Sequence, residues 1–565
     1  MISAVSGMRK KIKEIELWYL ERFGTILSSD KRLSWLIVAL LLFSAAFFNT
    51  AWVADDAFIT FRVIDNALNG YGLTWNPGER VQVYTHPLWF GVQLGLVAVF
   101  GDPYFVCLAI SYLLLCFTIF LLFTLPKELT WGSLAVIFSL LLSRSFVDYS
   151  SSGLENPLTH FLVAAYVWVW FKFEGRCRAY LLFSLGSALF LCRPDSLLLV
   201  IPSLLSLVYN SRSIMPALIG GLPVACWVCF SVFYYGAPIP NTALAKVGTG
   251  TTFLGAVEQA WAGLSWMYRH DTFSLFLLLF GGCAAWINQR GRVFFFGLLL
   301  WLIFYFYVGG DYMGGRFFST PILLAACMVL FFLRPFKAIL FTPFVFLSVG
   351  ALGNTLISPL SFNSQTISEN GIADERAFYY QGTGLKPALI NKGVVHHPWL
   401  VEGQLLSGQQ GFFVRCSIGM VGFGAGPAIH WIDPLALADP LLARLPARSN
   451  ARVGHFERAF PEGYLESIVL GENRLAGSRL KALFDDVQLA TTASLFAEGR
   501  AAAIWRLNSG FHSQVEVEFN KEKIGLPGVP VQNNAKPSCL GIQHGGAINW
   551  KLSEPPVVGM RIVFR

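Results

Sequence analysis

Eleven apolar segments, joined by short polar connections, fill most of the first 356 residues of this 565-residue chain. A helix needs about 20 apolar residues to cross a bilayer, and somewhat fewer when it packs inside a bundle. The pattern therefore predicts a multi-pass α-helical membrane protein with about eleven transmembrane helices, two of them short enough to be broken or re-entrant. A further segment at 87–101 is predicted to lie in the membrane interface. The predicted spans are 33–52, 103–125, 131–148, 157–173, 178–192, 197–209, 214–235, 272–288, 293–308, 317–333 and 338–356.

Charge density divides the chain into two parts. Only 13% of all residues are charged, whereas ordinary soluble domains carry about 25%. Residues 1–356 hold 23 Lys and Arg and 17 Asp and Glu, and the shorter remainder holds 19 and 17. We therefore expect an N-terminal cytoplasmic segment at 1–32, a membrane domain at 33–356 with a first exoplasmic loop at 53–102, and a soluble domain at 357–565. The net charge of +8 comes without a basic run interleaved with aromatics, so nucleic acid is not expected as a partner.

The positive charges of the membrane part predict its orientation, because cytoplasmic loops collect Lys and Arg. With eleven spans and a cytoplasmic N-terminus, 16 of the 23 cations fall on the cytoplasmic side. The C-terminal domain then faces outward, which for a bacterial cytoplasmic membrane means the periplasm. Seven cations share the outer side with acidic motifs, and ionisable groups near membrane depth are costly enough to suggest function. The seven are Arg62, Arg80, Arg144, Arg193, Lys246, Arg269 and Arg316.

Two adjacent carboxylates, Asp55 and Asp56, follow the first apolar segment directly. Their mutual repulsion would raise the pKa of one of them, which suits a general base or a cation site. Alternatively, they cap the next helix, since carboxylates favour helix N-termini. Capping requires only one acid, so it leaves the second unexplained.

Basic and glycine-containing motifs recur on the same predicted side of the membrane. Arg and Lys beside exposed backbone amides are the groups that hold a phosphate. No Walker-type glycine loop or dinucleotide fingerprint accompanies them, so the expected ligand is a lipid phosphate rather than a soluble nucleotide. A lone histidine such as His86 is more often structural than catalytic. The motifs lie at 76–87, 152–155, 240–246 and 309–316.

In these residues the chain resembles the GT-C glycosyltransferases, in which an acidic pair after the first span precedes an exoplasmic loop and an interfacial helix. Within that class it is similar to the arabinofuranosyltransferases of the AftB type and to the related TfpW type, which glycosylates pilins. The resemblance runs from residue 33 to about residue 470. It is carried by 55–62, 76–80, Tyr84-Thr85, 240–246, 310–316, 419–422, 432–435, 454–456 and 461–464.

The resemblance implies a polyprenyl-phosphate sugar donor, arabinofuranose as the sugar, and chemistry on the outer face of the membrane. The implied acceptor is a hydroxyl of a cell-envelope glycan or of a pilin Ser or Thr. Asp55 or Asp56 would deprotonate that hydroxyl, which implies inversion only if no covalent intermediate forms. The family pattern has Asn where this chain has His86.

The remaining implied roles divide between the two substrates. Binding of the donor phosphate, which stabilises it as a leaving group, falls to Lys246 and Arg316, with Arg62 and Arg193 as weaker candidates. Positioning of sugar or acceptor falls to Glu155, His86, Tyr84, Asn241 and Asp311.

The segment 357–565 is long enough for one compact domain. Alternation in Gln514–Phe519 predicts a strand, and apolar spacing near Leu435–Leu445 and Leu475–Phe484 predicts helices. The glycine-rich stretch Gly422–Pro427 predicts a turn between strands. We therefore expect a mixed α/β or α+β domain.

Two of the ten cysteines, Cys416 and Cys539, lie in the domain expected to face an oxidising compartment, so a disulfide between them is a candidate. No cluster of His and Cys has zinc spacing, and no cofactor is expected. A divalent cation at Asp55 and Asp56 finds no further support in the sequence.

Other classes of protein fit the composition less well. A transporter or a flippase for lipid-linked sugars would show internal repeats or paired broken helices, and no convincing repeat is found. A transporter also rarely needs so long an exoplasmic domain. A receptor or assembly scaffold would not need an acidic pair beside buried cations.

Overall fold

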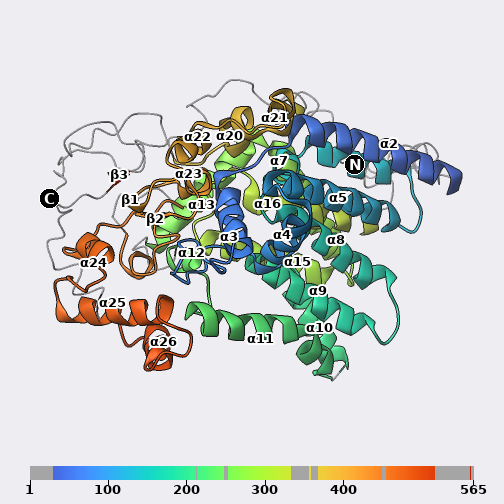
Figure 1. The fold of residues 1–565 in the computed structure, drawn as a ribbon. Coiled ribbons are helices and arrows are strands. Elements are labelled where there is room, and N and C mark those ends of the chain that lie inside the picture. The colour runs from blue at the N-terminus through green and yellow to red at the C-terminus, as the bar shows by residue number, and fades with distance from the viewer. Residues whose placement is uncertain are drawn as a thin grey trace, which may run out of the picture.

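The computed structural model describes residues 29–211, 213–246, 252–332, 355–357, 367–368, 370–447, 454–513, 515 and 560–561. Helices dominate the N-terminal two thirds of this part, and most of them run roughly side by side (Figure 1). In chain order they are α2 (Ser29–Thr50), α3 (Asp55–Leu68), α4 (Pro87–Phe100), α5 (Pro103–Thr124), α6 (Trp131–Ser139), η1 (Leu140–Leu142), α7 (Arg144–Tyr149), α8 (Asn156–Lys172), α9 (Arg178–Cys192), η2 (Pro194–Leu199), α10 (Ile201–Ser211), α11 (Met215–Tyr235), α12 (Asn241–Leu244), α13 (Phe253–His270), α14 (Thr272–Ile287), α15 (Arg292–Tyr307) and α16 (Arg316–Phe332).

Three helices of the described part are long and apolar enough to cross a membrane: α2 over Lys31–Thr50, α5 and α11. The pair α13 and α14 would add a fourth, although the two are bent by 108° at their junction. The other segments expected to span, as far as residue 332, are helical but shorter or interrupted. The segment 131–148, for example, divides into α6, η1 and α7. The protein is therefore a helical chain with three or four candidate spans, and eleven stays a prediction. The last expected span, 338–356, lies outside the described residues except for 355–356.

Local chemistry accounts for where several of these helices begin. Asp102 accepts a hydrogen bond from the backbone of Tyr104 (2.8 Å), with Pro103 in the first turn of α5. Thr130 and Ser133 form a reciprocal capping box at the start of α6. Helix α16 is buried on all sides from Phe318 to Leu330, as expected for an apolar helix in the centre of a bundle.

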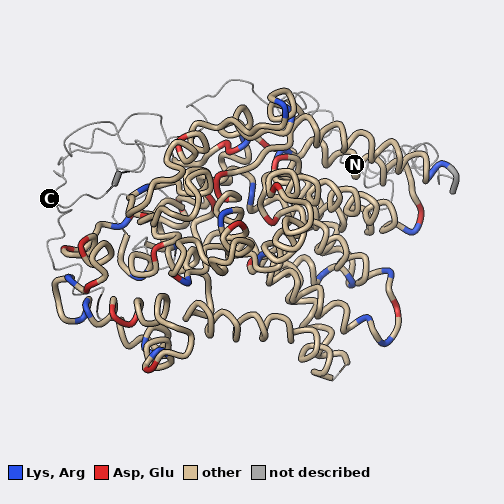
Figure 2. Tube along the Cα trace, viewed as in Figure 1, with Lys and Arg blue, Asp and Glu red and all other residues tan. Residues whose placement is uncertain are grey.

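Cations that the sequence places on the cytoplasmic side lie close together in the fold. Lys172 is within electrostatic reach of Arg32 and Lys127, and Arg178 is within reach of Arg290. These residues come from four separate loops or helix ends. Charged residues are sparse along the helices and gather at helix ends and in the interior around α3 (Figure 2). The side of the membrane on which these cations lie stays a prediction.

The C-terminal part contains short helices around a small three-stranded sheet with strand order β2-β1-β3. Strand β1 (Gly411–Val414) pairs in parallel with β2 (Ile429–Ile432) and antiparallel with β3 (Met560–Arg561). The connection from β1 to β2 is α23 (Ile418–Ala425), so these three elements form a compact βαβ unit. The other elements are α20 (Glu375–Thr383), α21 (Leu385–Ile390), α22 (Pro398–Leu405), η5 (Leu442–Arg444), α24 (Tyr464–Leu470), α25 (Ser478–Thr491) and α26 (Arg500–Asn508).

Three local expectations for this part need correction or stay untested. The helix predicted near Leu435–Leu445 is wrong: the segment consists of turns held by Asp433 and Asp439, and only Leu442–Arg444 forms a short 3-10 helix. The glycine-rich stretch Gly422–Pro427 does connect two strands, but it is helical as far as Ala425 and turns only at Gly426, whose φ is 75°. Its glycines let α23 lie against its neighbours: a Cβ at Gly422 would come within 2.5 Å of the Trp75 ring. The predicted strand Gln514–Phe519 lies outside the described residues except for Val515.

The first loop and the C-terminal part share one hydrophobic core. Side chains from residues 59–106 and 406–438 pack in a common cluster that includes Trp75, Phe90 and Trp431. Asn76 also pairs with the backbone of β2: its side chain donates to the carbonyl of Trp431 and accepts from the amide, both at 3.0 Å. The C-terminal part is thus fixed to the region around α3.

Candidate active site

The two adjacent aspartates at the start of α3 have different environments. Asp55 is buried, and its carboxylate accepts hydrogen bonds from the backbone amides of Gly419 (3.1 Å) and Met420 (2.7 Å). It therefore caps the N-terminus of α23 rather than that of its own helix. A Cβ at position 419 would lie 2.0 Å from the Asp55 carbonyl oxygen, so only glycine permits this approach. Asp55 is a structural link between α3 and the C-terminal part.

Asp56 is partly exposed and opens into a pocket between α3 and the C-terminal part. Its Oδ2 accepts a hydrogen bond from the Tyr312 hydroxyl (3.3 Å). Lys246 lies on the same pocket, and its side chain is exposed. The volume of the pocket is about 50 Å³, so a sugar would enter only after neighbouring side chains move. Of the two acids, Asp56 is the one accessible to a substrate.

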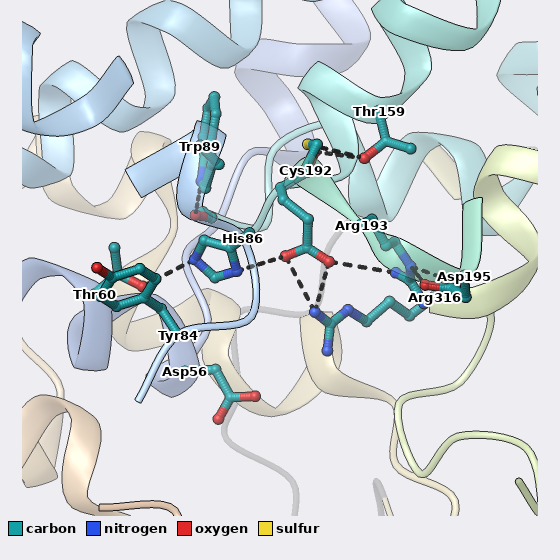
Figure 3. A network of polar contacts seen from close by, with 12 residues as sticks. Asp56, Thr60, Tyr84, His86, Trp89, Thr159, Cys192, Arg193, Asp195 and Arg316 are labelled. Carbon is teal, nitrogen blue, oxygen red and sulfur yellow. Dashed lines mark hydrogen bonds and ion pairs between the residues drawn. The ribbon is translucent and has the colours of Figure 1, made fainter. Parts of the chain in front are cut away.

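A buried ion-pair network centred on Glu155 lies beside Asp56 (Figure 3). One nitrogen of Arg316 reaches both oxygens of Glu155, at 3.0 and 3.2 Å. Arg193 contacts the same carboxylate at 3.5 Å and pairs with Asp195 at 2.9 Å. Four segments of the bundle contribute to this network: the starts of α8 and α16, the loop before α4, and the junction of α9 with η2.

His86 extends the network toward α3. Its Nδ1 lies 3.4 Å from Glu155, and its Nε2 lies 3.1 Å from the Thr60 hydroxyl. Burial lowers the pKa of His86, and Glu155 only partly opposes this, so the imidazole is neutral at pH 7. Burial alone would raise the pKa of Glu155, but Arg316, His86 and Arg193 outweigh it and hold the pKa at about 2. Glu155 is therefore ionised and fixes both arginines.

Asp311, in the loop between α15 and α16, interacts electrostatically with the same two arginines and with Lys246. Burial raises its pKa, while the charges of Arg316, Lys246 and Arg193 oppose the rise. Its Oδ2 is buried and has no hydrogen-bond partner among the described residues, and the same is true of Arg316 Nε. An acceptor and a donor in this region are therefore unused.

Three residues predicted for the site have their polar groups engaged in packing contacts, and two of them, Arg62 and Asn241, bind the backbone of the C-terminal part. Arg62 is buried over the Trp75 ring and donates to four backbone carbonyls, of Trp75, Gly422, Gly426 and Ile429.

The other two are Asn241 and Tyr84. The amide of Asn241 donates to the carbonyls of Ala436, Leu437 and Asp439. Tyr84 stacks on Phe90 and shares a hydrogen bond with Tyr235 (2.8 Å). The structure thus brings together Asp56, His86, Glu155, Arg193, Lys246, Asp311 and Arg316, with the Tyr84 ring beside His86 at 6.3 Å, and leaves Arg62 and Asn241 outside that group.

Several pocket residues were missed by sequence reasoning. The rings of Tyr312 and His455 meet edge to face at 4.5 Å. Both residues lie in the motifs 309–316 and 454–456, but neither was predicted as a site residue. Tyr379 and Trp399 also line the pocket, together with Glu375. The local sequence around Tyr379, Trp399 and Glu375 gives no sign of a site, because α20 and the start of α22 reach the pocket only through the tertiary fold.

The described residues contain no group of three or more His, Cys, Asp or Glu that could hold a metal ion. Cys416 is disulfide-bonded. Its predicted partner, Cys539, lies outside the described residues, so that pairing stays a prediction.

Buried carboxyls give the C-terminal part an unusual pH dependence. Burial raises the pKa of Asp55 and Asp433 to about 7, of Asp439 to about 6 and of Glu79 to about 8. Below about pH 6.5 the unfolded histidines also take up protons, whereas burial lowers the pKa of His397 to about 3 and of His430 to about 4. The folded state therefore binds more protons than the unfolded state chiefly between about pH 6.5 and 8, and stability falls as pH rises through this window. We expect a higher melting temperature at pH 6.5 than at pH 8 by thermal unfolding in detergent. Glu79→Gln should flatten this dependence; an unchanged slope in that variant would contradict the assignment.

Two curated proteins are similar to this chain in sequence. The terminal β-(1→2)-arabinofuranosyltransferase of Mycobacterium tuberculosis is 26% identical over 536 residues, covering 76% of this chain and 84% of the relative. The enzyme with the same description from Corynebacterium glutamicum is 27% identical over 331 residues, covering 48% of this chain and 46% of the relative. No family model matches the chain, and no solved structure does. The sequence likeness supports a relationship to arabinofuranosyltransferases.

Proposed function

We propose that this protein is a membrane glycosyltransferase that moves arabinofuranose from a polyprenyl-phosphate donor to an acceptor hydroxyl. The acceptor belongs to a cell-envelope glycan or to a pilin Ser or Thr. The reaction takes place on the periplasmic face of the bacterial cytoplasmic membrane, with the N-terminus in the cytoplasm. One observation carries the proposal: an accessible carboxylate, Asp56, shares a pocket with Lys246 beside two buried arginines, in a chain similar to two arabinofuranosyltransferases.

Asp56 is the general base of this mechanism. Its carboxylate takes the proton of the acceptor hydroxyl, and the freed oxygen attacks the anomeric carbon of the sugar. A new C–O bond forms as the bond from that carbon to the donor phosphate breaks, and the bonding pair leaves with the phosphate. The Tyr312 hydroxyl, 3.3 Å from Asp56, orients the base. A positioned base of this kind contributes about 10²–10⁴-fold to a rate.

The cations stabilise the phosphate that leaves. Lys246 is exposed on the pocket. Arg316 does not line the pocket, but its charge acts on Asp311 together with that of Lys246, and its Nε donor is unused. Positive charge fixed where negative charge develops lowers the barrier without reorganisation. Arg193 and Glu155 act through Arg316, because Glu155 holds both guanidiniums in place. They are positioning residues.

The direct test supplies membranes carrying the full chain with radiolabelled polyprenyl-phosphoryl arabinofuranose and an arabinan oligosaccharide or a pilin peptide. A nucleotide-linked arabinose serves as the competing donor. Transfer from the lipid donor alone is the expected result. Transfer from the nucleotide sugar alone would overturn the donor class, and no transfer from either would overturn the proposed function.

Replacing Lys246 with Gln should weaken donor binding while leaving the fold intact, because its side chain is exposed. A charge-assisted hydrogen bond is worth about 1.5–3 kcal/mol, so KM for the donor should rise roughly tenfold or more. Lys481→Gln, an exposed lysine on α25, is the control and should leave KM unchanged. Equal KM values for Lys246→Gln and wild type would remove Lys246 from the phosphate site.

A further inference from the structure

A second cavity of the described part, about 810 Å³, lies away from the Asp56 pocket and has no part in the proposed reaction. It is an open groove beside the C-terminal end of α2, lined by residues of α20, α21 and the loop before α22. Helix α20 separates the two sites. Glu375, Phe378 and Tyr379 line the Asp56 pocket, whereas Tyr380 and Gln381 line the groove. The two sites share no lining residue.

The groove lies where a membrane span ends. Helix α2 is one of the three helices long and apolar enough to cross a bilayer, and Asn49, in its last turn, lines the groove. The carbonyl of Asn49 accepts from the Tyr380 hydroxyl (2.6 Å), and that of Ala51 accepts from the Leu385 amide (2.8 Å). These bonds fix α20 and α21 to the end of α2. The groove is therefore at the level of the bilayer surface.

Its lining combines positive charge with exposed aliphatic side chains. Lys386 and His396 line it and are exposed, whereas no acidic side chain does so among the described residues. The pocket of Asp56, in contrast, holds three carboxylates. Ile357 and Ile390, on the rim of the groove, are 71% and 73% exposed. Exposed isoleucines are unfavourable in water but favourable against acyl chains.

We propose that this groove binds an anionic glycerophospholipid of the surrounding bilayer, with the headgroup phosphate at Lys386 and the acyl chains along Ile357 and Ile390. The carbonyls at the end of α2, which would repel an anion, are already occupied by Tyr380 and Leu385. The observations favour a bilayer lipid over the sugar donor, because a phosphate held here lies across α20 from Asp56. The lipid would link the C-terminal part to the membrane independently of catalysis.

The test titrates the detergent-purified full chain with dioleoylphosphatidylglycerol and measures bound lipid by native mass spectrometry and by the rise in melting temperature. Dioleoylphosphatidylcholine, with the same chains and no net charge, should bind at least fivefold more weakly. A lysine near an anionic lipid surface contributes about a fivefold gain, so Lys386→Gln should lose about that factor. Lys392→Gln, an exposed lysine next to α21 but outside the groove lining, should lose nothing.

A second variant tests the apolar half of the site without changing its charge. Ile390→Asn should weaken binding of the dioleoyl lipid roughly tenfold. Equal losses for Lys386→Gln and Lys392→Gln, or equal binding of the two lipids, would overturn the proposal. Displacement of phosphatidylglycerol by inorganic phosphate would reduce the groove to a simple anion site, and displacement by a polyprenyl phosphate would assign it to the donor. Either result would also overturn it.

Discussion

Asp56→Asn should abolish sugar transfer while leaving the fold intact. Asparagine matches aspartate in shape and can still accept the hydrogen bond from Tyr312, but it cannot take a proton from the acceptor hydroxyl. Loss of a positioned general base lowers the rate by about 10²–10⁴-fold. We expect kcat to fall by that factor with little change in the KM of the donor, measured with the radiolabelled lipid donor in membranes carrying the full chain.

Two variants on the same helix serve as controls for Asp56→Asn. Asp65→Asn changes an exposed acid of α3 and should leave transfer unchanged. Asp55→Asn loses the carboxylate that accepts from the amides of Gly419 and Met420, so it should lower the melting temperature more than kcat per folded molecule. If Asp56→Asn kept more than a tenth of the activity while folded Asp55→Asn had none, Asp55 rather than Asp56 would be the general base.

Glu155→Gln should destabilise the protein strongly. The substitution removes the carboxylate that forms ion pairs with both Arg316 and Arg193, and leaves two guanidiniums close together in a buried site. Breaking a buried ion pair by removing one partner costs about 3–5 kcal/mol. We expect a loss of that size in the free energy of unfolding, measured by denaturant titration of the full chain in mixed micelles. Donor KM should rise as well, because Arg316 would no longer be held.

Asp195→Asn is the matched control, since Asp195 pairs only with Arg193 in the network and is more exposed than Glu155. Its loss should stay near 1 kcal/mol or below, as expected for a partly solvated pair. The pKa of Glu155, about 2, adds a pH criterion. The stability from this lowered pKa is fully present above about pH 4.5 and is lost only as pH falls through about 2. If the Glu155→Gln variant were as stable as Asp195→Asn, Glu155 would not stabilise the fold through its ion pairs with Arg316 and Arg193.

The helical part of the fold follows from the sequence to a large extent. Every predicted span as far as residue 332 is helical, because continuous apolar residues leave the backbone no partner other than itself in a bilayer. The interruption of 131–148 was not predicted. It arises at Ser143 and Arg144, where Ser143 caps α7 and Arg144 pairs with Asp148 and Asp374. The first two contacts are local, but the pair with Asp374 reaches across the chain, and hydrophobic periodicity cannot show it.

The roles of Asp55 and Asp56 could be predicted only in part from the sequence. Adjacent carboxylates after an apolar span indicated a general base or a cation site, with capping of the following helix as the alternative. The sequence could not show which is which, nor that the capped helix is α23, some 360 positions later, rather than α3. Arg62 shows the same limit. A buried arginine suggested phosphate binding, whereas its donors are taken up by four carbonyls of the C-terminal part and of the first loop.

By itself the sequence indicated a membrane protein, and it predicted that the polar motifs belong to one side and that the acids after the first span take part in function. These properties depend on hydrophobicity and charge, which are additive along the chain. Only the tertiary structure decided that Asp56 rather than Asp55 is accessible, that Glu155 holds Arg193 and Arg316, and that Tyr312, Tyr379 and Trp399 complete the pocket. Those facts depend on which segments pack together, and the packing of α3 against α23, with α20 at the same pocket, is a property of the whole fold.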